Sequence, residues 1–370
     1  MLRIFNDLFQ RYFSEEEALI YTLLLITGTI VMMTLGSVIA PLLWSLVICF
    51  ILQGLVNSLV RMNIPYHLAV YITYILFLGL MVLIIFILLP FTWSRLFLFM
   101  DELPNMMGQL RSFLLLLPEN YPELFTETQI QGWINNLQDA LGQIGQNVLS
   151  YSVSSITRLV TWLVYTILVP VMVFFMLKDA DKLLNWLENW LPKKRPIMAQ
   201  IWKEMNGQLA NYIRGKALEI IIVGICSYLL YFVFGLNYPV LLALITGFSV
   251  IVPFVGATVV AIPVFLVALF QWGLGADLYQ VMIAYFILQM LDGNLLVPLI
   301  FSETVNLHPL AIITAILVFG GIWGFWGVFF AIPLATFLKA SIRAWPVRHH
   351  TEDSETKHST SNEETQEKQS

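Results

Sequence analysis

The sequence predicts an all-α protein that crosses a membrane through about six to eight helices. Of its 370 residues, 58% are hydrophobic and 12% are charged, which is about half the charged fraction of an ordinary soluble domain. Several apolar windows reach the roughly 18 residues expected of a helix that crosses about 30 Å of hydrocarbon. We therefore expect a multi-pass protein whose first partner is the lipid bilayer.

Residues 18–90 are expected to form three transmembrane helices, after a cytoplasmic N-terminal segment at residues 1–17. Their apolar windows lie at about 18–40, 41–60 and 66–90. Ser14 is placed to cap the first helix and Glu17 to complete a capping box, because side-chain oxygens three residues apart can bond the free N–H groups of a helix start. We expect this helix to be retained in the protein.

Two less apolar stretches, residues 91–150 and 178–216, are expected to be amphipathic helices interrupted by prolines. The interrupting prolines are Pro104, Pro118, Pro122, Pro192 and Pro196. The second stretch holds eight Lys and Arg residues, whereas the first holds two against six acidic residues. Because Lys and Arg are retained in the cytoplasm during insertion, we place 178–216 inside, 91–150 outside and a span at 152–177 between them. Both chain ends are then cytoplasmic.

The C-terminal membrane half, residues 217–340, contains an internal repeat made of two broken apolar windows, 239–270 and 308–340. Helix breakers lie in the centre of both, at residues 253–256 in the first and 320–327 in the second. Two prolines with the same spacing frame each copy, Pro239 and Pro263 in the first, Pro309 and Pro333 in the second.

Two topologies agree with the charges. If each broken window crosses once, there are about eight spans; if each is a re-entrant hairpin, there are about six spans and the hairpins enter from opposite faces. The Pro-Phe-Val-Gly and glycine-rich centres are typical of hairpin tips, which favours the second topology. Access to residues 271–277 from outside the cell would distinguish the two.

The helix breaks indicate where a solute could pass. Backbone released from helical bonding in a membrane has to face protein or a water-filled cavity, so paired breaks in two repeats indicate a transport site near the membrane midplane. The break residues that we assign to a solute or ion pathway are Pro253, Gly256, Gly320, Gly321, Gly324 and Gly327. The alternative is that the prolines only kink ordinary spans.

Polar residues inside the apolar window 278–301 extend this candidate pathway. Asp292 lies there with Gln289 and Asn294 close by, and an ionisable group at that depth costs about 3 kcal/mol or more unless it is paired or hydrated. We assign all three to the pathway, and Asp292 also to coupling. A hydrogen-bonding staple between helices is the alternative.

Glu219 and Glu303 are two further candidates for coupling. Glu219 lies close to Arg214 and Lys216 in sequence, so an ion pair on one helix face is the first expectation for it. Glu303 flanks the second broken window, where a solvated boundary residue is the alternative.

Other classes of function find no support in the sequence. Cys49 and Cys226 lie in apolar windows without a His or Cys partner at ligand spacing. We find no nucleophile and base pair, no phosphate loop and no basic surface rich in aromatics. We therefore expect no enzyme activity, metal, cofactor or nucleic-acid partner. Residues 349–370, with six acidic and two basic residues, are expected to be a disordered acidic tail.

Several motifs after Tyr212 resemble a known family. They are Tyr212-Ile213-Arg214-Gly215, Ile251-Val252-Pro253-Phe254-Val255-Gly256, Leu291-Asp292-Gly293-Asn294-Leu295-Leu296-Val297-Pro298, Leu307-His308-Pro309-Leu310 and Gly327-Val328-Phe329-Phe330-Ala331-Ile332-Pro333-Leu334. Together they resemble the autoinducer-2 exporter (AI-2E) family, and within it the PerM-type permeases, over about residues 15 to 345. The resemblance implies a transporter-like homo-oligomer in the inner membrane of bacteria.

The first functional hypothesis is a secondary transporter or permease for a small polar solute, which the resemblance implies is similar to the signal autoinducer-2. A sodium or lithium/proton antiporter is the alternative within transport. A membrane scaffold that presents residues 91–150 and 178–216 to partners is the alternative of another class.

Overall fold

The computed structural model describes residues 16–120, 126–153, 156–191, 195–253, 255–301 and 307–344. In these residues every regular element is helical, and eight helical segments are long and apolar enough to cross a membrane. The predicted fold class, an all-α multi-pass membrane protein, is confirmed. Residues 349–370, predicted to form the acidic tail, lie outside the described residues.

The elements are α-helices except for two short π-helical turns, η1 and η2. In chain order they are α2 (Glu16–Arg61), α3 (Tyr66–Leu83), η1 (Ile84–Leu88), α4 (Leu89–Asn120), α5 (Glu127–Val153), α6 (Ile156–Lys178), α7 (Ala180–Glu188), α8 (Pro196–Val233), α9 (Pro239–Ser249), α10 (Val255–Trp272), α11 (Ala276–Leu291), η2 (Asp292–Leu296), α12 (Val297–Phe301), α13 (Pro309–Phe329) and α14 (Ala331–Ala344).

An N-terminal group of helices is formed by α2, α3 and α6, which pack on one another. Its core contains Val56, Ala69 and Val173, each fully buried. Helix α2 joins the first two apolar windows and bends at Leu35, whose φ of −113° and ψ of 15° are not helical. The bend lies shortly before Pro41, and a proline commonly bends a helix on its N-terminal side.

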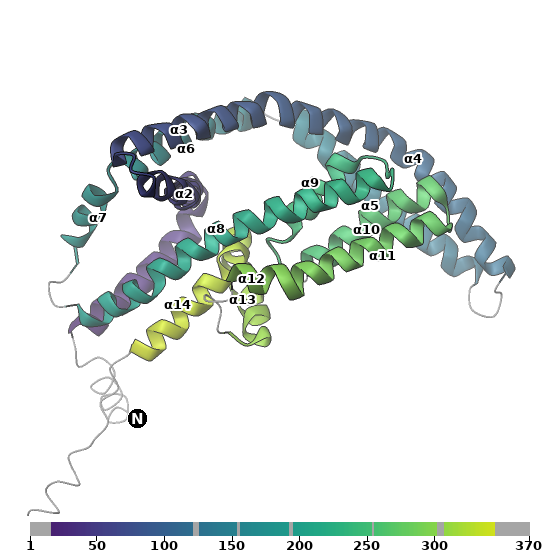
Figure 1. Ribbon diagram of the computed structural model, residues 1–370. Helices are drawn as coiled ribbons and strands as arrows, with labels where there is room; N and C mark the ends of the chain where they lie inside the picture. The colour runs from purple at the N-terminus through teal and green to yellow at the C-terminus, as the bar shows by residue number, and fades with distance from the viewer. Residues whose placement is uncertain are drawn as a thin grey trace, which may run out of the picture.

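Helix α4 carries the chain from this group to the far end of the molecule. Figure 1 shows α3 and α4 arching over α8 and α9 to reach α5. The expected interruptions at Pro104 and Pro118 are wrong, because α4 continues through both. A proline removes one helical hydrogen bond, and the buried Met106 and Leu110 hold α4 in place just beyond Pro104. Pro122 lies outside the described residues.

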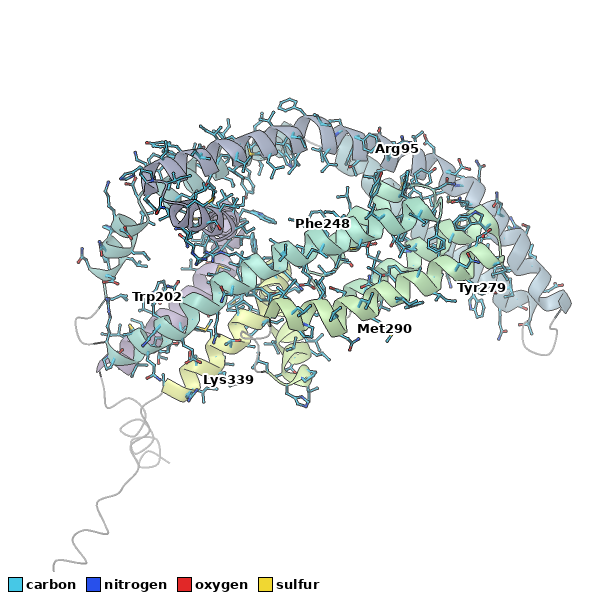
Figure 2. All side chains as sticks on the ribbon, viewed as in Figure 1. Arg95, Trp202, Phe248, Tyr279, Met290 and Lys339 are labelled. Carbon is cyan, nitrogen blue, oxygen red and sulfur yellow. The ribbon has the colours of Figure 1, made fainter. Side chains whose placement is uncertain are left out.

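The C-terminal group is built on α8, which begins at Pro196 as the proline pattern indicates and runs to Val233. Helices α9 and α11 pack along α8, and α10 packs against both of them. Gly224 and Gly247 bring α8 and α9 close together, because a Cβ on Gly247 would lie 3.0 Å from the Gly224 Cα. Figure 2 shows α11 running from Tyr279, at the end of the molecule near α5, to Met290 nearer its middle.

At the first residues of α8, the start of α2 and the end of α14 come together. The Glu17 carboxylate accepts hydrogen bonds from the backbone N–H groups of Ile197 (3.3 Å) and Met198 (2.8 Å), and the hydroxyls of Tyr21 and Ser341 are 2.6 Å apart. The predicted capping box is therefore wrong about Glu17, because the free N–H groups that it bonds belong to α8. Ser14 lies outside the described residues.

Candidate functional site

A buried ion pair lies on α8, where the sequence suggested only that Glu219 would find a basic neighbour. The Lys216 Nζ is 2.9 Å from Glu219 Oε2 and 3.1 Å from Oε1, and the two side chains are 5% and 2% exposed. The expected ion pair is thus present, and it is buried among helices. Arg214 points elsewhere and donates to the Phe50 carbonyl of α2. A buried pair of this kind is retained only where each charge keeps its partner.

Asp292 places a further charged group near this pair, and Gln289 lies one helical turn before Asp292. Asp292 begins the π-helical turn η2 and lies within electrostatic range of both Lys216 and Glu219. Its Oδ1 atom and the Nε2 atom of Gln289 are buried, and neither has a hydrogen-bond partner among the described residues. Buried polar atoms without a partner are uncommon in proteins, and π-helical turns occur often at functional sites.

Tyr212 and Phe301 are the aromatic residues that pack next to Lys216. The Tyr212 hydroxyl donates to the Phe329 carbonyl over 2.9 Å, and Lys216 Nζ lies 5.9 Å from the centre of the Phe301 ring. Gly215 permits this packing, since a Cβ there would come within 2.7 Å of Phe301 and Ile300. The α12 segment is therefore held tightly against α8 at the ion pair.

Both predicted helix breaks occur, and both are turns at which one helical arm folds back on another. Gly256 and Gly327 hold equivalent positions, because a Cβ at either would overlap the carbonyl oxygen of the facing arm, Ser249 in the first case and Phe319 in the second. Only glycine fits such a close approach. Gly324 makes the second turn with a φ of +58°.

Both turns border one apolar cluster on α8. Ile251 from the first turn and Trp326 from the second both pack against the cluster that contains Tyr212 and Phe301. Tyr212 lies one helical turn from Lys216, so the two breaks and the buried charges occupy one region. This brings together segments that are separated by about 75 residues in the sequence.

The remaining predicted residues lie at varied distances from this centre. Pro253 is half-buried in the first turn, and Gly320 packs against Val328. Gly321 and Gly324 are exposed. Asn294 is also exposed, and its amide donates to the Met290 carbonyl of its own helix. Glu303 lies outside the described residues.

Three buried hydroxyl residues that the sequence did not single out connect the helices of the C-terminal group. The Tyr285 hydroxyl donates to the Ala257 carbonyl over 2.6 Å, which holds the start of α10 on α11. The hydroxyls of Tyr231 and Thr246 are 2.9 Å apart and connect α8 to α9. Their only signal in the sequence is a polar side chain in an apolar window, and such residues commonly join membrane helices.

Comparison with known proteins gives a consistent result. The family model described as AI-2E family transporter matches residues 19–347. The chain is 44% identical over 346 residues to "Putative permease PerM" of Escherichia coli (strain K12), covering 94% of this chain and 98% of the relative. It is 29% identical over 313 residues to "Putative transport protein YueF" of Bacillus subtilis (strain 168), covering 82% and 84%. "Putative transport protein YrrI" of the same organism is 27% identical over 325 residues, with 83% and 86% covered.

Proposed function

Because the chain belongs to the AI-2E transporter family, whose model spans residues 19–347, we propose that it carries a small polar solute across the bacterial inner membrane as a secondary transporter. The observation that supports this most directly is the buried Oδ1 atom of Asp292, which has no hydrogen-bond partner among the described residues and lies within electrostatic range of the Lys216–Glu219 ion pair. The apolar cluster around Tyr212 and Phe301, next to Lys216, takes side chains from both hairpin turns. In a transport protein, an atom such as Asp292 Oδ1 suits a ligand that binds transiently.

The charges of the site favour a solute that donates hydrogen bonds. When all three groups are ionised, Asp292 and Glu219 contribute two negative charges and Lys216 one positive charge, so the site keeps one excess negative charge. A hydroxyl-bearing solute would donate to Asp292 and accept from the Gln289 amide. This chemistry agrees with a small polyhydroxylated signal of the autoinducer-2 type.

Movement of the hairpins relative to α8 supplies the alternating access that a secondary transporter needs. At Gly224 and Gly247, α8 and α9 approach each other without side chains between them, and this close contact is the point about which we propose that the α9–α10 arm tilts. We propose that the working form is a homo-oligomer with both chain ends in the cytoplasm, as the basic residues of the 178–216 stretch favour.

Exchange of sodium or lithium for protons is the second candidate, and the same excess negative charge favours it. A monovalent cation could replace the hydroxyl donor at Asp292, and a proton could compete with it there. Flux measurements separate the two candidates, since one predicts uptake of a neutral solute and the other a coupled cation and proton movement.

The test is flux into proteoliposomes, with autoinducer-2, sodium and lithium as probes. Asp292→Asn removes a charged hydrogen-bond acceptor that is worth about 1.5–3 kcal/mol, so we expect flux to fall about tenfold or more. Asp277→Asn is the matched control, because Asp277 lies on the first turn of α11 and is exposed. Equal flux in the wild type and in a folded Asp292→Asn variant would exclude this site. Absence of flux for every probe would favour the scaffold alternative.

A further inference from the structure

Helix α7 follows the membrane helix α6 after a single residue and stands apart from both helix groups. Figure 1 shows it at the edge of the molecule, between the end of α6 and the start of α8. None of its nine residues is buried. A short helix that packs on little of its own chain needs another environment to stabilise it, because isolated helices of this length are marginal in water.

One face of α7 is apolar and exposed. It presents Leu183, Leu184, Trp186 and Leu187, and Trp190 continues the same face beyond the helix end. Trp186 is 60% exposed and Trp190 is 75% exposed, and the two rings contact each other with centres 5.9 Å apart. The opposite face carries charged and amide groups. Tryptophan is enriched where a protein surface meets the boundary between lipid and water.

The chain around α7 carries an excess of positive charge. Residues 178–203 contain six basic and three acidic residues, which gives a net charge of +3. Two of the basic residues already have partners. Lys182 bonds Asp179 over 2.8 Å and thereby lowers the pKa of that carboxyl, and Arg195 pairs with Glu188 over 3.0 Å. Lys193 and Lys194 lie in the same basic segment, directly before Arg195.

We infer that α7 is an interfacial helix that binds anionic lipid headgroups. Its apolar face inserts at the level of the headgroups, and the net charge of +3 over residues 178–203 attracts the phosphates of acidic lipids. The position of α7 directly after Lys178, at the end of a membrane-spanning helix, places it at a bilayer surface. This inference is independent of the solute that the protein carries.

The test uses the full-length protein in nanodiscs, with Cys49 and Cys226 replaced by serine and a single nitroxide label at Leu187→Cys or Asn185→Cys. Oxygen, which concentrates in lipid, and a nickel chelate, which stays in water, report the depth of each label. One set of nanodiscs contains phosphatidylcholine, and in the other a third of the lipid is phosphatidylglycerol. We expect the Leu187 label to be reached by oxygen and protected from nickel, and the Asn185 label to show the reverse.

The role of the basic segment is tested by Lys193→Gln together with Lys194→Gln. In phosphatidylglycerol nanodiscs, this change should reduce the ratio of inserted to water-exposed label by about tenfold, because each lysine contributes near an anionic surface. Arg95→Gln with Arg111→Gln removes the same charge from α4 and should leave that ratio unchanged. A Leu187 label open to nickel overturns the inference. Protection of the Leu187 label from both reagents, which a protein partner would cause, also overturns it. Equal insertion in nanodiscs with and without phosphatidylglycerol overturns it as well.

Discussion

Lys216 and Glu219 depend on each other, because both side chains are almost fully buried. Glu219→Gln would leave the Lys216 ammonium buried without its counter-ion, and breaking a buried pair in this way costs about 3–5 kcal/mol. We therefore expect a clear fall in the unfolding temperature of the detergent-solubilised protein. The control is Glu188→Gln, which breaks the partly exposed pair with Arg195 and should cost less than about 1 kcal/mol. Equal effects of the two changes would contradict a buried role for Glu219.

At the scale of single residues, the sequence predicted the conspicuous polar residues and an ion pair for Glu219, but not that this pair is buried. Asp292, Gln289 and Glu219 stand out because polar groups are rare in apolar windows, and all three lie in or beside the candidate site. Arg214 and Lys216 were both expected as neighbours of Glu219, and the structure pairs Glu219 with Lys216. The burial of this pair could not be predicted until α8 was known to continue from the 178–216 stretch into the membrane half.

Some glycines of the hairpin turns are required by close packing, and others are not. A methyl group at Gly327 would overlap the Phe319 carbonyl, whereas nothing lies within 4 Å of the corresponding position at Gly321. We therefore expect Gly327→Ala to lower the free energy of unfolding by about 1–3 kcal/mol, as overpacking does, and to reduce flux. Gly321→Ala, an exposed position in the same hairpin, should leave both unchanged.

Thermal unfolding and proteoliposome flux measure these two variants side by side, and Gly256→Ala provides the equivalent change in the first hairpin. If Gly327→Ala and Gly256→Ala unfold and transport like the wild type, the close approach of the hairpin arms has no importance in the working protein.

Helix breaks were predicted correctly where a local sequence pattern determines them. Helix continuity and side-chain partners were predicted poorly where contacts with distant residues determine them. The repeat located both turns, since helix breakers act on their own backbone. Pro104 misled the prediction because a proline ends a helix only if nothing else holds the helix together, and the contacts of Met106 and Leu110 are not visible in a local pattern. Glu17 was misassigned for the same reason, because its partner at Met198 lies 181 residues away.

At the scale of the whole molecule, the first hairpin favours a re-entrant path. Helix α9 has 11 residues and is about 16 Å long, too short to cross roughly 30 Å of hydrocarbon. Its start and the end of α10 are fastened together by Gln271, which accepts from the Asn237 N–H and donates to the Gly235 carbonyl, both over 2.7 Å. The chain thus returns to the end of α8 from which it left.

This geometry predicts that Leu274 faces the same side of the membrane as the Val233 end of α8, which we propose lies outside the cell. In a protein without its two native cysteines, Leu274→Cys should react with a membrane-impermeant maleimide in intact cells, because Leu274 is half-exposed and lies beyond the base of the hairpin. Gln109→Cys on α4 should react equally, and Asn185→Cys on α7 should react only after the cells are permeabilised. If Leu274→Cys, like Asn185→Cys, reacts with the maleimide only in permeabilised cells, the first broken window crosses the membrane once, and the protein has eight spans instead of six.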